Sequence, residues 1–265
     1  MAESLTEWGD AAAAYDLSYA GMCAGAIPAV LAHARAGVLA DVGCGTGRLA
    51  RAAAAAGHRV LACDPSPSMA AAARARLAGR PAQVHRAGLP ELAGFTDHGA
   101  PVAADTVVCA FVLQQLPDPA AAMAALAALA RPDAAVITLT WPTGYLPHRH
   151  VVLDLLDELG ADPLPAAAAS PLRPSPEGLA ELAAGAGLEM VRAAEERWTW
   201  STDWPSFRTG LRAGIAHTGA RFLAQGPGLR AEVERRLPAA LAAYGPPEAL
   251  RIPCRAALCV ARRPG

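Results

Sequence analysis

The sequence predicts an α/β protein built on one doubly wound sheet, because strand-like and helix-like runs alternate through its first half. Short apolar runs rich in β-branched residues are separated by alanine-rich runs of helical length. Alternation at this spacing is typical of parallel strands joined by right-handed helical crossovers. A glycine-rich turn joins the first of these strands to the first of these helices, and α/β sheets bind ligands at such turns.

The first half of the chain divides readily into elements. Gly57 marks the end of the first helix, Ser66 is a suitable N-cap for the second, and Pro132 with Asp133 supplies a turn. We therefore expect strands at residues 38–42, 59–63, 83–85, 106–113 and 135–141, and helices at residues 48–56, 67–77 and 120–130.

After Trp141 the regular alternation stops. We expect a loop at 142–147, a Pro- and Ala-rich connector at 161–176, helices at 151–159, 177–184, 205–224 and 229–244, and strands at 188–200 and 252–262. The connector is too short to mark a domain boundary, so we expect one domain. Its parts are a helical cap at 1–35, a ligand-binding core at 36–141, a substrate cover at 142–250, and a last strand with a tail at 251–265.

Composition excludes several classes of function. The chain has 265 residues and a formal net charge of −1, without the basic excess that nucleic-acid binding requires. No run of about 18 strongly apolar residues predicts a membrane span. The six cysteines form no CxxC pair, so we expect reduced thiols and no metal site. The acidic N-terminal segment lacks the pattern of a signal peptide, which indicates a cytoplasmic protein.

The glycine-rich turn carries the first functional signal. Gly43, Gly45 and Gly47 follow an apolar strand and open a helix, so backbone N–H groups and a positive dipole end are available to a carboxylate. Arg48 stands where the dinucleotide fingerprint has its last glycine, and Asp64 ends the next strand, where an acid can bind ribose hydroxyls. This pattern indicates a nucleoside cofactor with a carboxylate-bearing arm.

Three segments resemble the class I methyltransferases that depend on S-adenosylmethionine (SAM). VLADVGCGTGRLA at 38–50 resembles their motif I, LACDPSPSM at 61–69 resembles the ribose-binding motif, and DTVVCAFVLQQLPD at 105–118 is similar to the fourth-strand motif of the small-molecule subgroup. The resemblance spans about 36–141. It implies a Rossmann-like, seven-stranded sheet with an antiparallel C-terminal strand and inserted helical cover, SAM as the methyl donor, and S-adenosylhomocysteine as the product.

The resemblance also implies a set of cofactor-binding residues. The glycine turn would bind the methionine end of the cofactor, and Asp64, after the second strand, would bind the ribose. Pro65 and Met69 would pack near the adenine. The family's usual acid for the adenine amino group is missing after the third strand, so a backbone contact is expected there. The implied residues are Asp41, Gly43, Cys44, Gly45, Gly47, Asp64, Pro65, Met69, Ala87, Gly88, Ala110 and Phe111.

Candidate substrate residues come from less specific signals. Gln114 and Gln115 stand where the subgroup often has two histidines, and glutamine can position a substrate without acting as a base. Tyr15 and Tyr19 lie four apart on one helical face, where they would either close over the site or pack in the core. Tyr145 lies in the loop after the fifth strand and is a further candidate.

His148, His150 and His217 are candidate bases, against the alternative that each is a surface or capping residue. Trp198 and Trp200 share one strand face, which fits either a core under the added helices or an apolar wall of the substrate pocket.

The sequence therefore predicts transfer of a methyl group to an O, N or C atom of a small molecule, which the resemblance indicates is a bacterial natural product or metabolite. One alternative is a SAM-binding protein of the same fold that regulates or catalyses another reaction. An NAD-dependent oxidoreductase is a weaker one, because Arg48 disfavours a dinucleotide. We expect no nucleic-acid or membrane partner and make no prediction of the oligomeric state.

Overall fold

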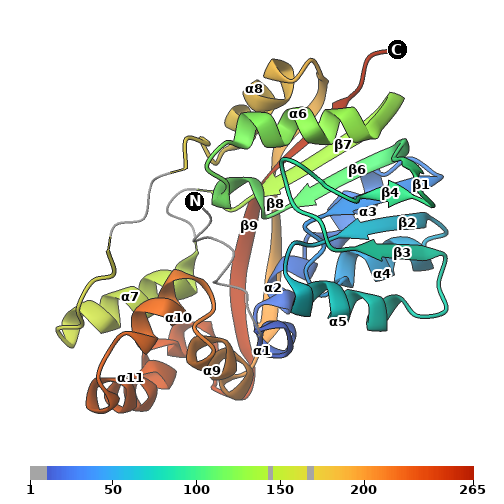
Figure 1. The fold of residues 1–265 in the computed structure, drawn as a ribbon. Coiled ribbons are helices and arrows are strands. Elements are labelled where there is room, and N and C mark those ends of the chain that lie inside the picture. The colour runs from blue at the N-terminus through green and yellow to red at the C-terminus, as the bar shows by residue number, and fades with distance from the viewer. Residues whose placement is uncertain (1–10, 143–145, 166–169) are drawn as a thin grey trace.

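A computed structural model describes residues 11–142, 146–165 and 170–265, and it contains the expected seven-stranded sheet (Figure 1). The strand order is β3-β2-β1-β6-β7-β9-β8. Neighbouring strands from β3 to β7 are parallel, whereas β9 is antiparallel to both β7 and β8. The prediction of a Rossmann-like sheet with an antiparallel C-terminal strand is confirmed. The strands are β1 (Val38–Val42), β2 (Arg59–Cys63), β3 (Ala82–His85), β6 (Ala104–Ala110), β7 (Ala130–Thr140), β8 (Glu189–Thr202) and β9 (Leu250–Arg262).

Helices cover both faces of the sheet, as a first strand that is buried along its whole length requires. Val38, Ala40 and Val42 face the core under α6 (Pro119–Leu129) and α8 (Pro176–Gly185). Leu39 faces the opposite core under α3 (Ile27–His33), α4 (Arg48–Ala55) and α5 (Pro67–Leu77). The chain adds β2 and β3 on one side of β1 and then returns to place β6 on the other, so the order reverses between β1 and β6.

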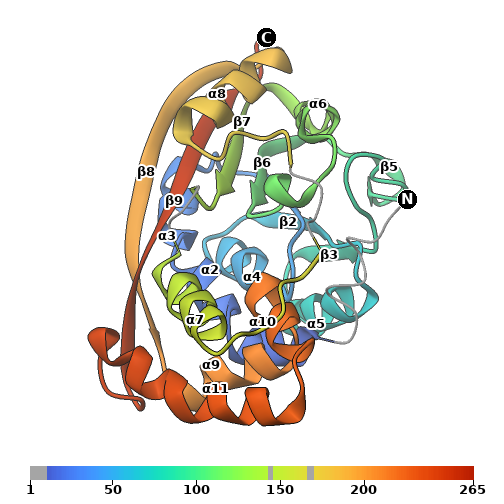
Figure 2. The same ribbon diagram turned by 90° about the vertical axis from the view of Figure 1, so that its left-hand side faces the viewer.

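The last two strands extend well beyond the sheet. Residues 257–262 of β9 pair with both β7 and β8, whereas residues 250–256 pair with β8 alone. Figures 1 and 2 show this two-stranded ribbon running from the sheet to a separate group of helices. The group consists of α7 (Pro147–Glu158), α9 (Trp204–Arg212), α10 (Ala216–Leu223) and α11 (Pro227–Ala240), with α1 (Ala12–Leu17) and α2 (Ala20–Ala24) between it and the sheet.

Several expected boundaries were wrong, each for a local reason. The fourth strand ends at Ala110, because Phe111 adopts a φ of +63° and the short helix η2 (Leu113–Gln115) follows. The helix expected at 205–224 is two helices, α9 and α10, separated at Gly214, whose φ is +71°. The loop expected at 142–147 ends at Pro147, where α7 begins, so His148 is helical.

Smaller elements complete the described chain. A hairpin of β4 (Thr96–Asp97) and β5 (Ala100–Pro101) was not predicted, and the helix expected at 229–244 is divided into α11 and the short helix η3 (Ala242–Tyr244). The expected N-cap is confirmed, since Ser66 Oγ accepts a hydrogen bond from Met69 N at 3.4 Å. Among the described residues, no helix combines the length and the apolar character needed to cross a membrane.

Candidate cofactor and substrate site

A cavity of about 560 Å³ lies at the carboxyl ends of the parallel strands, on both sides of the strand-order reversal. Its walls come from the segments that follow β1, β2, β6 and β7, and α1, α2, α7 and α10 close it from the cover side. This is the place where α/β sheets bind ligands. The predicted cofactor residues that line it are Asp41, Gly43, Cys44, Gly45, Asp64, Pro65, Met69, Ala110 and Phe111.

The three glycines of the turn have different roles, although all have positive φ: +79° at Gly43, +54° at Gly45 and +80° at Gly47. A Cβ at Gly43 would lie 2.4 Å from Val112 Cγ2, and one at Gly47 would lie 3.0 Å from Ala73 Cβ. At Gly45 the nearest atom would be Tyr15 Cε1 at 3.7 Å. Gly43 and Gly47 therefore permit close packing of protein on protein, whereas Gly45 leaves open space that faces the cavity.

Asp64 ties the glycine turn to the start of α5. Its Oδ2 accepts a hydrogen bond from Gly45 N and its Oδ1 accepts one from Ser66 N, both at 2.9 Å. Burial raises the pKa of this carboxyl, although the two backbone N–H groups oppose the rise. Because each carboxylate oxygen accepts more than one hydrogen bond, Asp64 retains acceptor capacity toward the cavity that it lines.

Asp41 is a buried carboxyl whose Oδ2 has no hydrogen-bond partner among the described residues. Burial, with a smaller contribution from the nearby charge of Asp64, raises the pKa of Asp41 to about 7, although a backbone hydrogen bond from Ala50 opposes the rise. A buried carboxylate with one oxygen unpaired is costly, and a cation in the cavity would satisfy that oxygen. The α-ammonium group of SAM is such a cation, so the residues present fit the methionine end of this cofactor.

The N-terminal segment is clasped to the glycine turn through Asp16, which the sequence analysis missed. Asp16 Oδ1 accepts hydrogen bonds from Thr46 Oγ1 at 2.8 Å and from Arg48 Nε at 2.9 Å, and Arg76 Nη2 donates to Oδ2 at 2.6 Å. Burial alone would raise the pKa of Asp16, but these hydrogen bonds outweigh it and lower the pKa. The clasp places Tyr15 beside Gly45, at the cavity wall.

Gln114 and Gln115 line the cavity, but their amide nitrogens serve the backbone of Phe111. Both Nε2 atoms donate to Phe111 O at 2.7 Å, and Gln114 Oε1 accepts from Thr140 Oγ1 at 2.8 Å. A positive φ is rare for an aromatic residue, and here two hydrogen bonds support it. The Phe111 ring in turn stacks on Trp141, with ring centroids 4.0 Å apart and planes 14° from parallel.

Tyr19 and His148 form the opposite wall of the cavity. Burial, aided by the nearby charges of Arg149 and His150, lowers the pKa of His148 to about 3. Its imidazole is therefore neutral at physiological pH and is a weak base. His217 also lines the cavity and is exposed, whereas His150 is exposed and does not line it. Tyr145 lies outside the described residues.

Three predicted cofactor residues do not line the cavity. Gly47 packs against Ala73, Ala87 belongs to a hydrophobic core, and a Cβ at Gly88 would lie 2.9 Å from Pro65 Cβ. The core interpretation of Trp200 is confirmed, since it is 3% exposed, and Trp198 Nε1 donates to Met22 O at 2.9 Å. Lining residues outside the predicted set include Thr46 and Ser66, which lie within the two motifs, and Trp141, Arg149, Ala216 and Thr218, which no motif marks.

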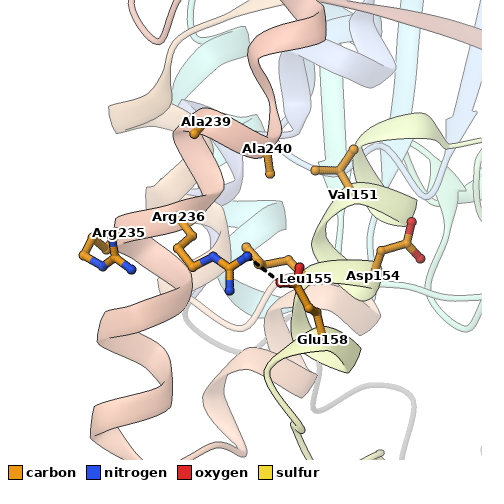
Figure 3. Close-up of a pocket in the computed structure, with 8 residues that line it drawn as sticks. All are labelled: Val151, Asp154, Leu155, Glu158, Arg235, Arg236, Ala239 and Ala240. Carbon is orange, nitrogen blue, oxygen red and sulfur yellow. Dashed lines mark hydrogen bonds and ion pairs between the residues drawn. The ribbon is translucent and has the colours of Figure 1, made fainter.

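A second hollow, of about 450 Å³, lies between α7 and α11 and shares no lining residue with the first. Figure 3 shows Arg236 reaching from α11 toward Glu158 on α7, and the two side chains form an ion pair at 2.6 Å. Its lining mixes apolar side chains with charged ones, of which Arg235, Arg236 and Glu158 form ion pairs within the protein. Across the described residues, no group of His, Cys, Asp and Glu is arranged to hold a metal ion.

Comparisons with known proteins agree with this geometry. Residues 40–136, from β1 into β7, match a family model described as a methyltransferase domain. The ubiquinone biosynthesis O-methyltransferase of Aromatoleum aromaticum is 37% identical over 102 residues, which are 38% of this chain and 42% of that protein. The match thus spans less than half the length of this curated relative.

Two solved structures share the fold. A candidate type II methyltransferase from Anaeromyxobacter dehalogenans is 21% identical with a TM-score of 0.56, covering 91% of this chain and 97% of its own. The [4+2]-cyclase SpnF is 17% identical with a TM-score of 0.51, covering 92% of this chain and 81% of its own. The family-model match over residues 40–136 and the strand order together identify a methyltransferase domain within this chain.

Proposed function

We propose that this protein transfers a methyl group from SAM to an O, N or C atom of a small molecule. The observation that carries the proposal is the cavity at the strand-order reversal, where Gly45 and the buried Asp41 carboxyl, whose Oδ2 has no partner among the described residues, lie together. A buried acid with a vacant acceptor site, next to backbone N–H groups, is suited to the zwitterionic end of an amino acid.

Each end of the cofactor has residues suited to it. Asp41 would bind the ammonium group, and the N–H groups of the glycine turn would face the carboxylate. Asp64 would accept hydrogen bonds from the ribose hydroxyls, and Pro65 with Met69 would pack against the adenine ring. All of these residues line one cavity.

The remaining residues position the acceptor and exclude water. SAM supplies a methyl group on a positively charged sulfur, so attack along the line of the C–S bond needs no covalent enzyme intermediate. Orientation of two reactants contributes a large part of such a rate enhancement. Phe111, fixed by Gln114 and Gln115, and the wall formed by Tyr19 and His148 are the rigid groups suited to this task.

A second candidate function is catalysis of another reaction in the same SAM-binding fold. The pKa of His148, lowered to about 3, favours this alternative, because a buried imidazole so weakly basic gives little help in removing a proton. The structural likeness to a [4+2]-cyclase also supports it. An NAD-dependent reaction is disfavoured, because Arg48 and Asp16 fill the space beside the turn where a dinucleotide needs a glycine.

Calorimetric titration tests the proposal. We expect SAM and S-adenosylhomocysteine to bind, NADH to bind more weakly than either, and Asp64→Ala to weaken both adenosyl ligands. Preferential binding of NADH would overturn the proposal. Labelled SAM should then deliver its methyl group to an acceptor in a small-molecule extract, and binding without any transfer would favour the second candidate.

A further inference from the structure

One arginine of the cavity wall has no partner within the part of the chain that the structure describes. Arg149 lies on α7, lines the cavity and is exposed, so it lies where the cavity opens to solvent. Among the described residues, its guanidinium group forms no hydrogen bond and no ion pair. The other arginine in the described wall, Arg48, is already paired with Asp16 at 2.9 Å. Arg149 is therefore the lining guanidinium that a ligand can reach and pair with.

The charge of Arg149 acts on the inner wall of the cavity. His148 precedes it on α7, lines the same cavity and is only 4% exposed. The Arg149 guanidinium lies close enough to this buried imidazole to help lower its pKa. A guanidinium directed into bulk water would be screened from a buried ring. The charged group of Arg149 therefore lies beside the wall that His148 forms.

The acids and the bases that line the cavity come from different sides of it. In the described wall, the carboxyls are Asp41 and Asp64, and both follow strands on the sheet side. Arg149 and His217 belong to the cover helices α7 and α10, which pack against each other. The first residue of α10, Ala216, also lines the cavity, so the positive end of this helix dipole has the same sign. The cover side is thus positive, with no lining acid to neutralise it.

An anionic group is the ligand that suits the cover side. A guanidinium donates two parallel hydrogen bonds to the oxygens of a carboxylate or a phosphate, and an imidazole N–H adds a further donor. An ammonium group would be repelled by Arg149, and a neutral hydroxyl would gain no charge interaction. The stacked Phe111 and Trp141 rings line the same cavity and offer flat apolar surface to the rest of the molecule.

We propose, on the basis of the methyltransferase function above, that the acceptor carries an anionic group, a carboxylate or a phosphate, which Arg149 binds where the cavity opens. His217 on the neighbouring helix is a second donor to this group. The apolar part of the acceptor lies against Phe111 and Trp141. Arg149 thereby selects an anionic acceptor against neutral and cationic molecules of the same shape.

Four phenyl compounds of similar size test this assignment. Benzoate, phenyl phosphate, benzyl alcohol and benzylamine are titrated by calorimetry into protein saturated with S-adenosylhomocysteine. We expect the better of the two anions to bind about 10-fold tighter than benzyl alcohol, and benzylamine to bind most weakly. The comparison of benzoate with phenyl phosphate distinguishes a carboxylate site from a phosphate site. Acetate has the charge without the ring and should bind more weakly than benzoate.

Variants then locate the preference. Arg149→Gln should lower the affinity for the better anion about 5- to 10-fold and leave the affinity for benzyl alcohol unchanged. Added salt should weaken anion binding in the wild type more than in Arg149→Gln. His217→Gln should have a smaller effect, about 2-fold. Arg251→Gln removes the same charge from an exposed position on β9 outside the cavity, and as the matched control it should change no affinity.

Because Arg149 is exposed and unpaired among the described residues, Arg149→Gln should unfold at the same urea concentration as the wild type. It should also bind S-adenosylhomocysteine with wild-type affinity, which shows that the cofactor side is intact.

Four outcomes would overturn the assignment: neither anion binding tighter than benzyl alcohol, a preference for anions that persists in Arg149→Gln, an equal loss in Arg251→Gln, or binding of no probe to the loaded protein. Failure of the wild type to bind S-adenosylhomocysteine would instead overturn the methyltransferase proposal, so the two failures are distinguishable.

Discussion

The cofactor half and the substrate half of the cavity are lined by different kinds of chemical group. The cofactor half consists of carboxyls and backbone N–H groups on short segments after β1 and β2, and the Asp16 clasp holds them with charged hydrogen bonds. The substrate half consists of aromatic rings and neutral polar groups from α7, the N-terminal helices and the ends of β6 and β7, with Arg149 where it opens to solvent. A charged ligand of fixed structure suits the first half, and an apolar ligand with an anionic end suits the second.

The largest effect is expected where the substrate half meets its own core. Phe207 is fully buried behind Tyr19 and His148. Phe207→Ala should lower the free energy of unfolding by about 3 to 5 kcal/mol, since it removes a large buried ring. If packing in the substrate half is independent of the cofactor half, the affinity of the folded variant for S-adenosylhomocysteine should change less than about 3-fold. Urea unfolding measures the free energy of unfolding, and calorimetry measures the affinity for S-adenosylhomocysteine. A loss of binding free energy as large as the loss of stability would show that the two halves are not independent.

The next effect separates two glycines within the cofactor half. Gly43→Ala should lower the free energy of unfolding by about 2 to 4 kcal/mol, because it adds both a Cβ clash and a strained positive φ. Gly45→Ala has the φ strain alone and should cost about 1 to 2 kcal/mol, while weakening SAM binding because its Cβ faces the cavity. Equal losses of stability in the two variants, or unchanged SAM affinity in Gly45→Ala, would contradict the different roles assigned to Gly43 and Gly45.

The smallest effect tests the clasp between the N-terminal segment and the turn. The Asp16 side chain is 28% exposed, so Asp16→Ala should cost only about 1 kcal/mol of stability. The substitution should also loosen the N-terminal segment that holds Tyr15 beside Gly45, and it should speed SAM dissociation about 3- to 10-fold. Stopped-flow displacement measures this dissociation rate. Glu181→Ala breaks the exposed pair of Arg173 and Glu181 and is the matched control. If both variants release SAM at the wild-type rate, the clasp has no part in holding the cofactor.

The cofactor half was predictable from the sequence because its parts are local. Val42 pairs with Cys63 in adjacent parallel strands, so the glycine turn and Asp64, which follow those strands, had to meet. The fold followed from the same regularity. Ala87 and Gly88 are not among the residues that line the cavity, because the chain after β3 packs into the core and against Pro65.

The substrate half was not predictable, because its contacts join segments that no strand register connects. Tyr19 meets His148 only through the packing of α2 and α7 against Trp200 and Phe207. We expected a loop at 142–147 and a helix only from 151, whereas α7 begins at Pro147 and includes His148. Asp16 stood in no motif, and its partners Arg48 and Arg76 lie on two different helices.

The most direct test of the central claim, that Asp41 binds the ammonium group of SAM, is the pH dependence of SAM affinity. In the folded protein burial raises the pKa of Asp41 from 3.8 to about 7. The folded state therefore holds this proton more tightly than the unfolded state, and the contribution of Asp41 to stability falls as pH rises through that window. Binding of a cation requires the ionised carboxylate, so SAM binding below pH 7 must release the proton.

We predict that SAM affinity, measured by calorimetry, rises about 5- to 10-fold between pH 6 and pH 8 in the wild-type protein. In Asp41→Asn the affinity should be lower and nearly independent of pH over the same range. A wild-type affinity that does not change with pH, or an equal rise in Asp41→Asn, would contradict the assignment of Asp41 to the cofactor.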